Sequence, residues 1–165
     1  GIEWVIVGHS ERRHLVSKES DIILFDKAVV ALHLDLNIIF CIGESLKERE
    51  ENRTFEVCLK QLQLLVDNLS FKSWKNIVIA YEPVWAIGTG KNATPEQVEE
   101  VHSFLRKYLI ENIDYQIANS IRIIYGGSVK PSNATELYQQ PNIDGFLVGG
   151  SSLKEDFLEI IECTL

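Results

Sequence analysis

Short apolar runs of strand length alternate with helical patterns along the whole chain, and few folds accommodate this alternation. The runs cover residues 4–7, 38–42, 77–81, 121–125 and 146–148. They are nearly continuous rather than interrupted by polar residues, which is typical of parallel strands that are buried on both faces. Because a helical pattern separates the runs, the chain is predicted to form an α/β fold with right-handed parallel crossovers.

The clearest helix signal begins at Thr94. Thr94 is a candidate N-cap, Pro95 suits the first helical position, and Gln97 completes a capping box. From Val98 to Tyr108, apolar residues recur at steps of three or four and form one stripe. Other helices are predicted over residues 21–34, 55–69, 131–139 and 153–161, and the charged run 47–51 is predicted to be a solvated helix start.

Two architectures are compatible with this pattern, an open doubly wound sheet and a barrel. A complete eight-fold barrel needs about 250 residues, whereas this chain has 165 residues. With five strand-length runs, a barrel built from this chain would be incomplete. No low-complexity linker divides the sequence, so residues 1–165 are predicted to form a single domain.

Composition and charge argue against several classes of partner. A hydrophobic content of 45% with 24% charged residues is typical of a globular protein. A net charge of −8 disfavours nucleic acid, because affinity for phosphate backbones comes largely from clustered Lys and Arg. No stretch has the roughly 18 consecutive apolar residues of a spanning helix, and the first residues do not look like a leader, so we expect neither a membrane partner nor secretion. Cys41, Cys58 and Cys163 lack the spacing of a disulfide framework or a zinc site.

Glycine pairs follow the last two apolar runs, at Gly126-Gly127 and Gly149-Gly150. Glycine lets the backbone approach a ligand closely, and the helix predicted after each pair aims unpaired N–H groups at it, which favours an anion. Either pair alone is most simply a tight turn. Because both pairs lie between a strand and a helix, together they favour a phosphate site.

Glu82 and His9 also stand directly after apolar runs. Partial desolvation raises the pKa of a carboxylate and makes it a better general base near neutral pH, but a solvated loop glutamate explains the position of Glu82 equally well. His9 at a helix start would be held neutral by the helix dipole, and a core histidine with satisfied hydrogen bonds is the alternative.

The segment 83–91 combines a proline, an apolar middle and a Gly-Thr-Gly tip, which suits a lid that excludes water, although a static loop has the same composition. Residues 88–93 also match the GxGxxA pattern of dinucleotide-binding folds. Six residues separate the strand from the first glycine of this pattern, and the next strand ends in Tyr125-Gly126-Gly127 instead of an acidic residue. A nucleotide-binding enzyme is therefore the weaker rival.

Four segments together resemble the triosephosphate isomerase family from end to end of the chain. They are WVIVGHSERR at 4–13, AYEPVWAIGTGK at 80–91, IRIIYGGSVKPSN at 121–133 and DGFLVGGSSLK at 144–154. The resemblance is to the C-terminal two-thirds of the family. It implies a partial TIM (β/α)8 barrel of about five parallel β/α units, corresponding to strands 4 to 8.

The resemblance also implies a reaction and the residues that perform it. Glu82 would transfer a proton between adjacent carbons of dihydroxyacetone phosphate and D-glyceraldehyde 3-phosphate through an enediolate, a step of glycolysis and gluconeogenesis. His9 would be the neutral electrophile at the carbonyl oxygen, a pairing established for this family. Glu11 would orient the site. The phosphate would bind backbone N–H groups of Gly88, Ser128, Gly149 and Gly150.

A closing lid is implied over the segment Pro83, Val84, Trp85, Ala86, Ile87, Gly88, Thr89, Gly90 and Lys91, received by Tyr125 and Ser128. Proton transfer beside a carbonyl requires no metal or cofactor, and we expect none. The family implies a cytoplasmic location and a homodimer for the full-length enzyme.

The family's asparagine and lysine after its first strand have no counterpart in this sequence, so we expect the chain alone to be inactive. Two alternatives stay open beside the isomerase. One is a non-catalytic remnant that serves only in binding or assembly, and the other is the nucleotide-binding α/β enzyme.

Overall fold

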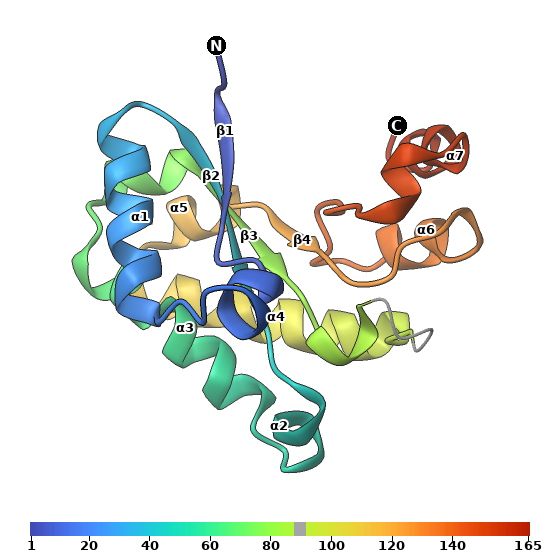
Figure 1. Cartoon of the computed structure of the whole chain (residues 1–165), viewed down its shortest axis with the longest axis horizontal. Helices are drawn as coiled ribbons and strands as arrows, with labels where there is room; N and C mark the ends of the chain where they lie inside the picture. Colours follow the sequence, from blue (N-terminus) through green and yellow to red (C-terminus); the bar gives the residue numbers. More distant parts are fainter. Residues whose placement is uncertain (88–91) are drawn as a thin grey trace.

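A four-stranded parallel sheet forms the centre of the computed structural model, which describes residues 1–87 and 92–165 (Figure 1). Its strands are β1 (Trp4–Val7), β2 (Asn37–Ile42), β3 (Ile77–Tyr81) and β4 (Ile123–Tyr125). Each strand pairs in parallel with the next one in the chain, giving the order β1-β2-β3-β4. A doubly wound sheet reverses its strand order near the middle, whereas a barrel does not. The observed order is that of part of a barrel.

The two faces of the sheet are covered differently, which also supports a partial barrel. Side chains at alternating strand positions, such as Phe40 and Ile79, pack into the main core with α1, α3 and α4. The intervening residues, including Cys41 and Ala80, form a small second cluster that contains no residue from any described helix. Helices therefore cover one face of this sheet, whereas a doubly wound fold covers both.

The helices match most of the sequence predictions. They are α1 (Asp21–His33), α2 (Leu46–Glu50), α3 (Thr54–Asn68), α4 (Pro95–Asn112), α5 (Tyr115–Ser120), α6 (Pro131–Tyr138) and α7 (Asp156–Glu162). Shorter turns are η1 (Glu11–Leu15), η2 (Phe71–Asn76), η3 (Val84–Ala86) and η4 (Gly150–Leu153). The predicted capping box of α4 is confirmed, since Thr94 Oγ1 accepts from Gln97 N–H at 3.3 Å and Gln97 Oε1 accepts from Thr94 N–H at 3.1 Å. The sequence patterns did not predict α5 or η2.

The fifth apolar run, 146–148, joins the sheet less extensively than the sequence predicts. It forms one parallel bridge, between Tyr125 and Phe146. The N–H of Leu147 donates to the carbonyl of Tyr125 at 2.9 Å, and Tyr125 N–H donates to Gly145 at 3.0 Å. Among the described residues this run hydrogen-bonds with a neighbouring segment on one side only. Its pairing with the sheet is therefore limited to this bridge. The described residues thus form four strands and one bridged segment where five strands are predicted.

Candidate active site

A cavity of about 450 Å³ lies at the carboxyl ends of the strands. The residues that line it include His9, Glu82, Ile87, Gly126, Gly127, Ser128, Gly149 and Gly150. They follow β1, β3, β4 and the bridged segment, which are far apart in the sequence. Parallel pairing brings these four strand ends to one edge of the sheet, as is usual for the sites of α/β folds.

Glu82 is the buried carboxylate of this cavity, with a side chain only 2% exposed. Its Oε2 accepts a hydrogen bond from the backbone N–H of Ser10 at 3.0 Å. Its Oε1 lies 3.3 Å from His9 Nε2 and has no further hydrogen-bond partner among the described residues. Burial raises the pKa of Glu82, and the nearby His9 and the Ser10 N–H offset part of that rise. The buried position, not the solvated one, is therefore observed.

His9 contacts Glu82 through one ring nitrogen and the backbone through the other. Its side chain is 33% exposed. The N–H of Glu11 donates to His9 Nδ1 at 3.4 Å, and a nitrogen that accepts a hydrogen bond carries no proton. This contact assigns the proton of a neutral ring to Nε2, which points to Glu82. A neutral imidazole with Nε2–H beside the cavity can donate a hydrogen bond to a substrate oxygen.

Glu11 is placed differently from the other predicted site residues. It begins the single-turn π-helix η1, and its side chain is exposed. Among the described residues its carboxylate has no hydrogen bond or ion pair, and only its backbone N–H reaches the site, through His9. Any orienting effect from Glu11 therefore acts through its main chain.

The two glycine pairs meet different surroundings. A Cβ on Gly127 would collide with the hydroxyl of Tyr125, and a Cβ on Gly126 would lie 2.8 Å from Glu82 Cγ. Gly149 and Gly150 have no described atom within 4 Å of such a Cβ. The first pair is therefore required for packing beside Glu82 and Tyr125, whereas the second leaves open space where a ligand can approach the backbone.

Part of the predicted lid lies within the described residues. Pro83 precedes the 3-10 turn η3, Ala86 is fully buried, and Ile87 lines the cavity. Gly88, Thr89, Gly90 and Lys91 lie outside the described residues. Tyr125, predicted to receive the lid, has a buried hydroxyl without a hydrogen-bond partner among the described residues, and burial raises its pKa to about 12.

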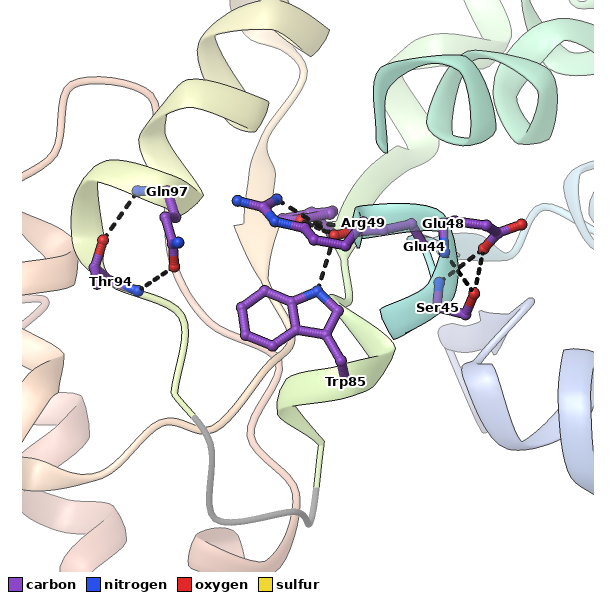
Figure 2. Close-up of polar contacts among 8 residues, drawn as sticks. Glu44, Ser45, Glu48, Arg49, Trp85, Thr94 and Gln97 are labelled. Carbon is purple, nitrogen blue, oxygen red and sulfur yellow. Dashed lines mark hydrogen bonds and ion pairs between the residues drawn. The ribbon is translucent and has the colours of Figure 1, made fainter. Parts of the chain in front are cut away.

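Glu44 is a buried carboxylate that sequence reasoning assigned no role. It accepts from Trp85 Nε1 at 2.9 Å and from the Tyr81 hydroxyl at 3.2 and 3.1 Å, and it pairs with Arg49 at 3.3 Å (Figure 2). The Arg49 guanidinium also lies over the Trp85 ring, 5.4 Å from its centroid. Figure 2 shows this network before residues 88–91 and the Thr94–Gln97 capping box after them. Its position in the sequence could have indicated a role, because Glu44 comes shortly after β2 much as Glu82 comes directly after β3.

Cys41 lies closer to the chemistry than its sequence context indicated. Cys41 is fully buried in β2 and lies near the carboxylate of Glu82. Burial raises the pKa of the Cys41 thiol, and the negative charge of Glu82 raises it further. The thiol is thus held in its neutral form near the candidate base.

The described residues offer neither a metal site nor a membrane-spanning helix. Among those residues, no group of three or more His, Cys, Asp or Glu side chains is arranged to hold a metal ion. No described helix has the length and apolar character needed to cross a membrane.

Comparison with known proteins gives a consistent result. Residues 1–164 match the sequence model of a family described as triosephosphate isomerase. A cytosolic triosephosphate isomerase of Gracilaria gracilis is 58% identical over 164 residues, covering 98% of this chain and 65% of the relative. A Taenia solium triosephosphate isomerase is 54% identical (98% and 64%), and a chloroplastic one of Secale cereale is 53% identical (97% and 53%). The chain therefore spans less than two-thirds of the length of these relatives.

Proposed function

Since this chain belongs to the triosephosphate isomerase family, we propose that it supplies the catalytic base and the phosphate-binding loops for the interconversion of dihydroxyacetone phosphate and D-glyceraldehyde 3-phosphate. The observation that carries the proposal is the contact of 3.3 Å between His9 Nε2 and the buried Oε1 of Glu82. This contact lies in a cavity that both glycine pairs line.

The proposed reaction moves one proton between two neighbouring carbons. Glu82 takes a proton from the carbon beside the carbonyl, and His9 Nε2–H stabilises the negative charge that develops on the carbonyl oxygen. Glu82 returns the proton to the adjacent carbon of the enediolate, while the hydroxyl proton passes to the former carbonyl oxygen. The second oxygen thereby becomes the carbonyl, and the product has the same composition and charge as the substrate. The raised pKa of Glu82 supports this role, because a base works best when its pKa approaches the ambient pH.

The anionic end of the triose would bind to backbone N–H groups. We assign this role to Ser128, Gly149 and Gly150, which line the cavity, and to Gly88 from the family resemblance. The open space around Gly149 and Gly150 supports the assignment. Glu11 would position His9 through its backbone N–H.

The segment from Pro83 to Lys91 would close over the bound triose and be received by Tyr125 and Ser128. Hydrogen bonds on both sides of residues 88–91 support a hinged lid, because they hold the two ends of the segment in place. Glu44 would hold the first end through Trp85, and the α4 capping box would hold the second.

Assembly and location follow from the family and stay proposals. A phosphorylated triose is the substrate class, and the full-length enzyme would be a homodimer. The Gracilaria gracilis relative is named cytosolic and supports a cytoplasmic location, while the Secale cereale relative is named chloroplastic. We further propose that residues 1–165 belong to one barrel domain.

The decisive experiment assays isomerisation of D-glyceraldehyde 3-phosphate by a polypeptide of these 165 residues, alone and with a separate N-terminal family segment. That segment needs about 85 residues, the balance of a barrel of about 250. We expect negligible turnover alone, because the family's lysine is absent, and recovery on complementation. Glu82→Gln should reduce the recovered turnover by roughly 10²-fold to 10⁴-fold.

Each other outcome contradicts a specific part of the proposal. Strong turnover by the polypeptide alone would disprove the need for the lysine. A folded complex without turnover would favour a non-catalytic remnant. Turnover that survives Glu82→Gln would remove Glu82 as the base.

A further inference from the structure

Two lysines line the candidate active-site cavity beside the glycine pairs. Lys130 stands at the N-cap of α6, shortly after Gly126-Gly127, and Lys154 follows η4, shortly after Gly149-Gly150. Both side chains are exposed. Among the described residues neither lysine forms an ion pair with an acidic side chain, whereas Lys27, for example, pairs with Glu19 at 2.6 Å.

The charged residues that line the cavity differ in balance from those of the chain as a whole. The chain carries a net charge of −8, which repels an anion at long range. The backbone N–H groups of the glycine loops orient an anion but carry no net charge. Among the described residues that line the cavity, Glu82 is the only acidic one, and Lys130 and Lys154 are the only Lys or Arg residues. The cavity is therefore locally more positive than the protein as a whole.

We propose that Lys130 and Lys154 supply the positive field that draws a phosphate dianion into the cavity, with the glycine loops then fixing its orientation. The proposal rests on the proposed function, because the dianion is the phosphate of the triose. Charged groups at the rim of a cleft raise the local concentration of an oppositely charged ligand and its association rate, and salt screens this effect. The two lysines would thus set the affinity for the dianion without taking part in proton transfer.

The test measures binding of inorganic phosphate to the ¹⁵N-labelled chain by NMR, using the backbone amides of Ser128, Gly149 and Gly150 as reporters. Lys130→Gln and Lys154→Gln should each raise the dissociation constant roughly threefold to tenfold at low ionic strength. Near about 1 M salt, where the Debye length is about 3 Å, the difference should largely disappear. Lys130→Arg and Lys154→Arg should retain most of the affinity, since they keep the charge.

A matched control is Lys75→Gln, which removes the same charge from an exposed lysine in η2, before the amino end of β3 and away from the cavity. It should leave phosphate binding unchanged, and the dispersion of the NMR spectrum shows that each variant is folded. Equal weakening by Lys75→Gln would reduce the effect to net charge and overturn the proposal. Unchanged affinity in both cavity variants, or no phosphate-induced shift at the reporter amides, would also overturn it.

Failure of the proposed function looks different. Lysine-dependent phosphate binding together with a folded, complemented barrel that does not isomerise the triose would keep the anion site and reject the isomerase. Turnover that depends on Glu82 but not on Lys130 or Lys154 would keep the isomerase and reject the role of the lysines.

Discussion

The indole N–H of Trp85 donates to Oε1 of Glu44 across 2.9 Å, and this bond joins the start of the proposed lid to the end of β2. Glu44 is completely buried and uses the same carboxylate to accept from Tyr81 and Arg49. A buried charge is tolerated only when such partners are present. Glu44 thus fixes Trp85 at the start of the proposed lid.

Replacement of Glu44 tests this anchor. Glu44→Gln removes the charge that three donors share, so at least one buried or half-buried donor loses its acceptor. We expect the free energy of unfolding to fall by about 2–3 kcal/mol, measured by equilibrium urea denaturation. The control Glu51→Gln removes an exposed pair with Arg53 and should leave the denaturation midpoint nearly unchanged. Equal effects of the two substitutions would contradict a special role for Glu44.

Shortening the candidate base tests its reach. Glu82→Asp keeps the charge but withdraws the carboxylate by one methylene from His9 and the cavity. Misplacement by about 1 Å costs roughly 10²-fold in rate. In the complemented enzyme, kcat should therefore fall about a hundredfold, with a much smaller change in KM, because the phosphate contacts do not involve Glu82. A higher KM at constant kcat would show that Glu82 acts in substrate binding and not in the chemical step.

The burial of Glu82 predicts an effect of pH on stability. Burial raises its pKa above the ordinary 4.5, so over this range the folded chain holds a proton that the unfolded chain has lost. This contribution is full below about pH 4.5 and is lost as the pH rises through the folded-state pKa. We expect Glu82→Gln, which does not ionise, to unfold at higher urea than the unaltered chain near about pH 8, with the gap closing near about pH 4.

The exposed acid Glu3 provides the comparison for that measurement, since Glu3→Gln changes the same chemical group outside the core. Its effect on the urea midpoint should be small at both pH values. A stabilisation by Glu82→Gln that is equally large at both would show that ionisation is not its cause.

His102 predicts a pH effect of the opposite sign. It is fully buried in α4, hydrogen-bonds the carbonyl of Asn142 at 3.0 Å, and burial lowers its pKa from 6.5 to about 4. The stability it contributes is present above about pH 6.5 and is lost as the pH falls towards 4, by about 3 kcal/mol in total. His102→Gln should be less stable than the unaltered chain at neutral pH and should lose less stability on acidification. The control His33→Gln, at an exposed position, should show the same dependence of unfolding free energy on pH as the unaltered chain.

The glycine pairs predict two different consequences of an added methyl group. Gly127→Ala places Cβ against the Tyr125 hydroxyl and should destabilise the fold by about 1–3 kcal/mol. Gly150→Ala meets no described atom and should leave the urea midpoint nearly unchanged while weakening phosphate binding, because its methyl group enters the cavity. Loss of stability in Gly150→Ala, or none in Gly127→Ala, would contradict this division of roles.

Local patterns were read correctly from the sequence because their causes are local. The apolar runs gave four of the five expected strands, and the capping box at Thr94 and Gln97 started α4 where predicted. The motifs also placed Glu82, His9 and both glycine pairs around one cavity, since parallel strands bring their carboxyl ends together. The exceptions were α5 and η2, which lack a strong periodic signal.

The amino-acid sequence by itself determined the family, the alternation of strands and helices, and which residues follow each strand. Only the tertiary structure decided that Glu82 accepts a hydrogen bond from Ser10, that Glu44 holds Trp85, and that residues 146–148 make a single bridge. Helix capping and hydrophobic periodicity depend on neighbours within a turn or two of chain. The pKa of a buried acid and the pairing of a strand depend instead on groups distant in sequence, whose separation is set when the sheet assembles.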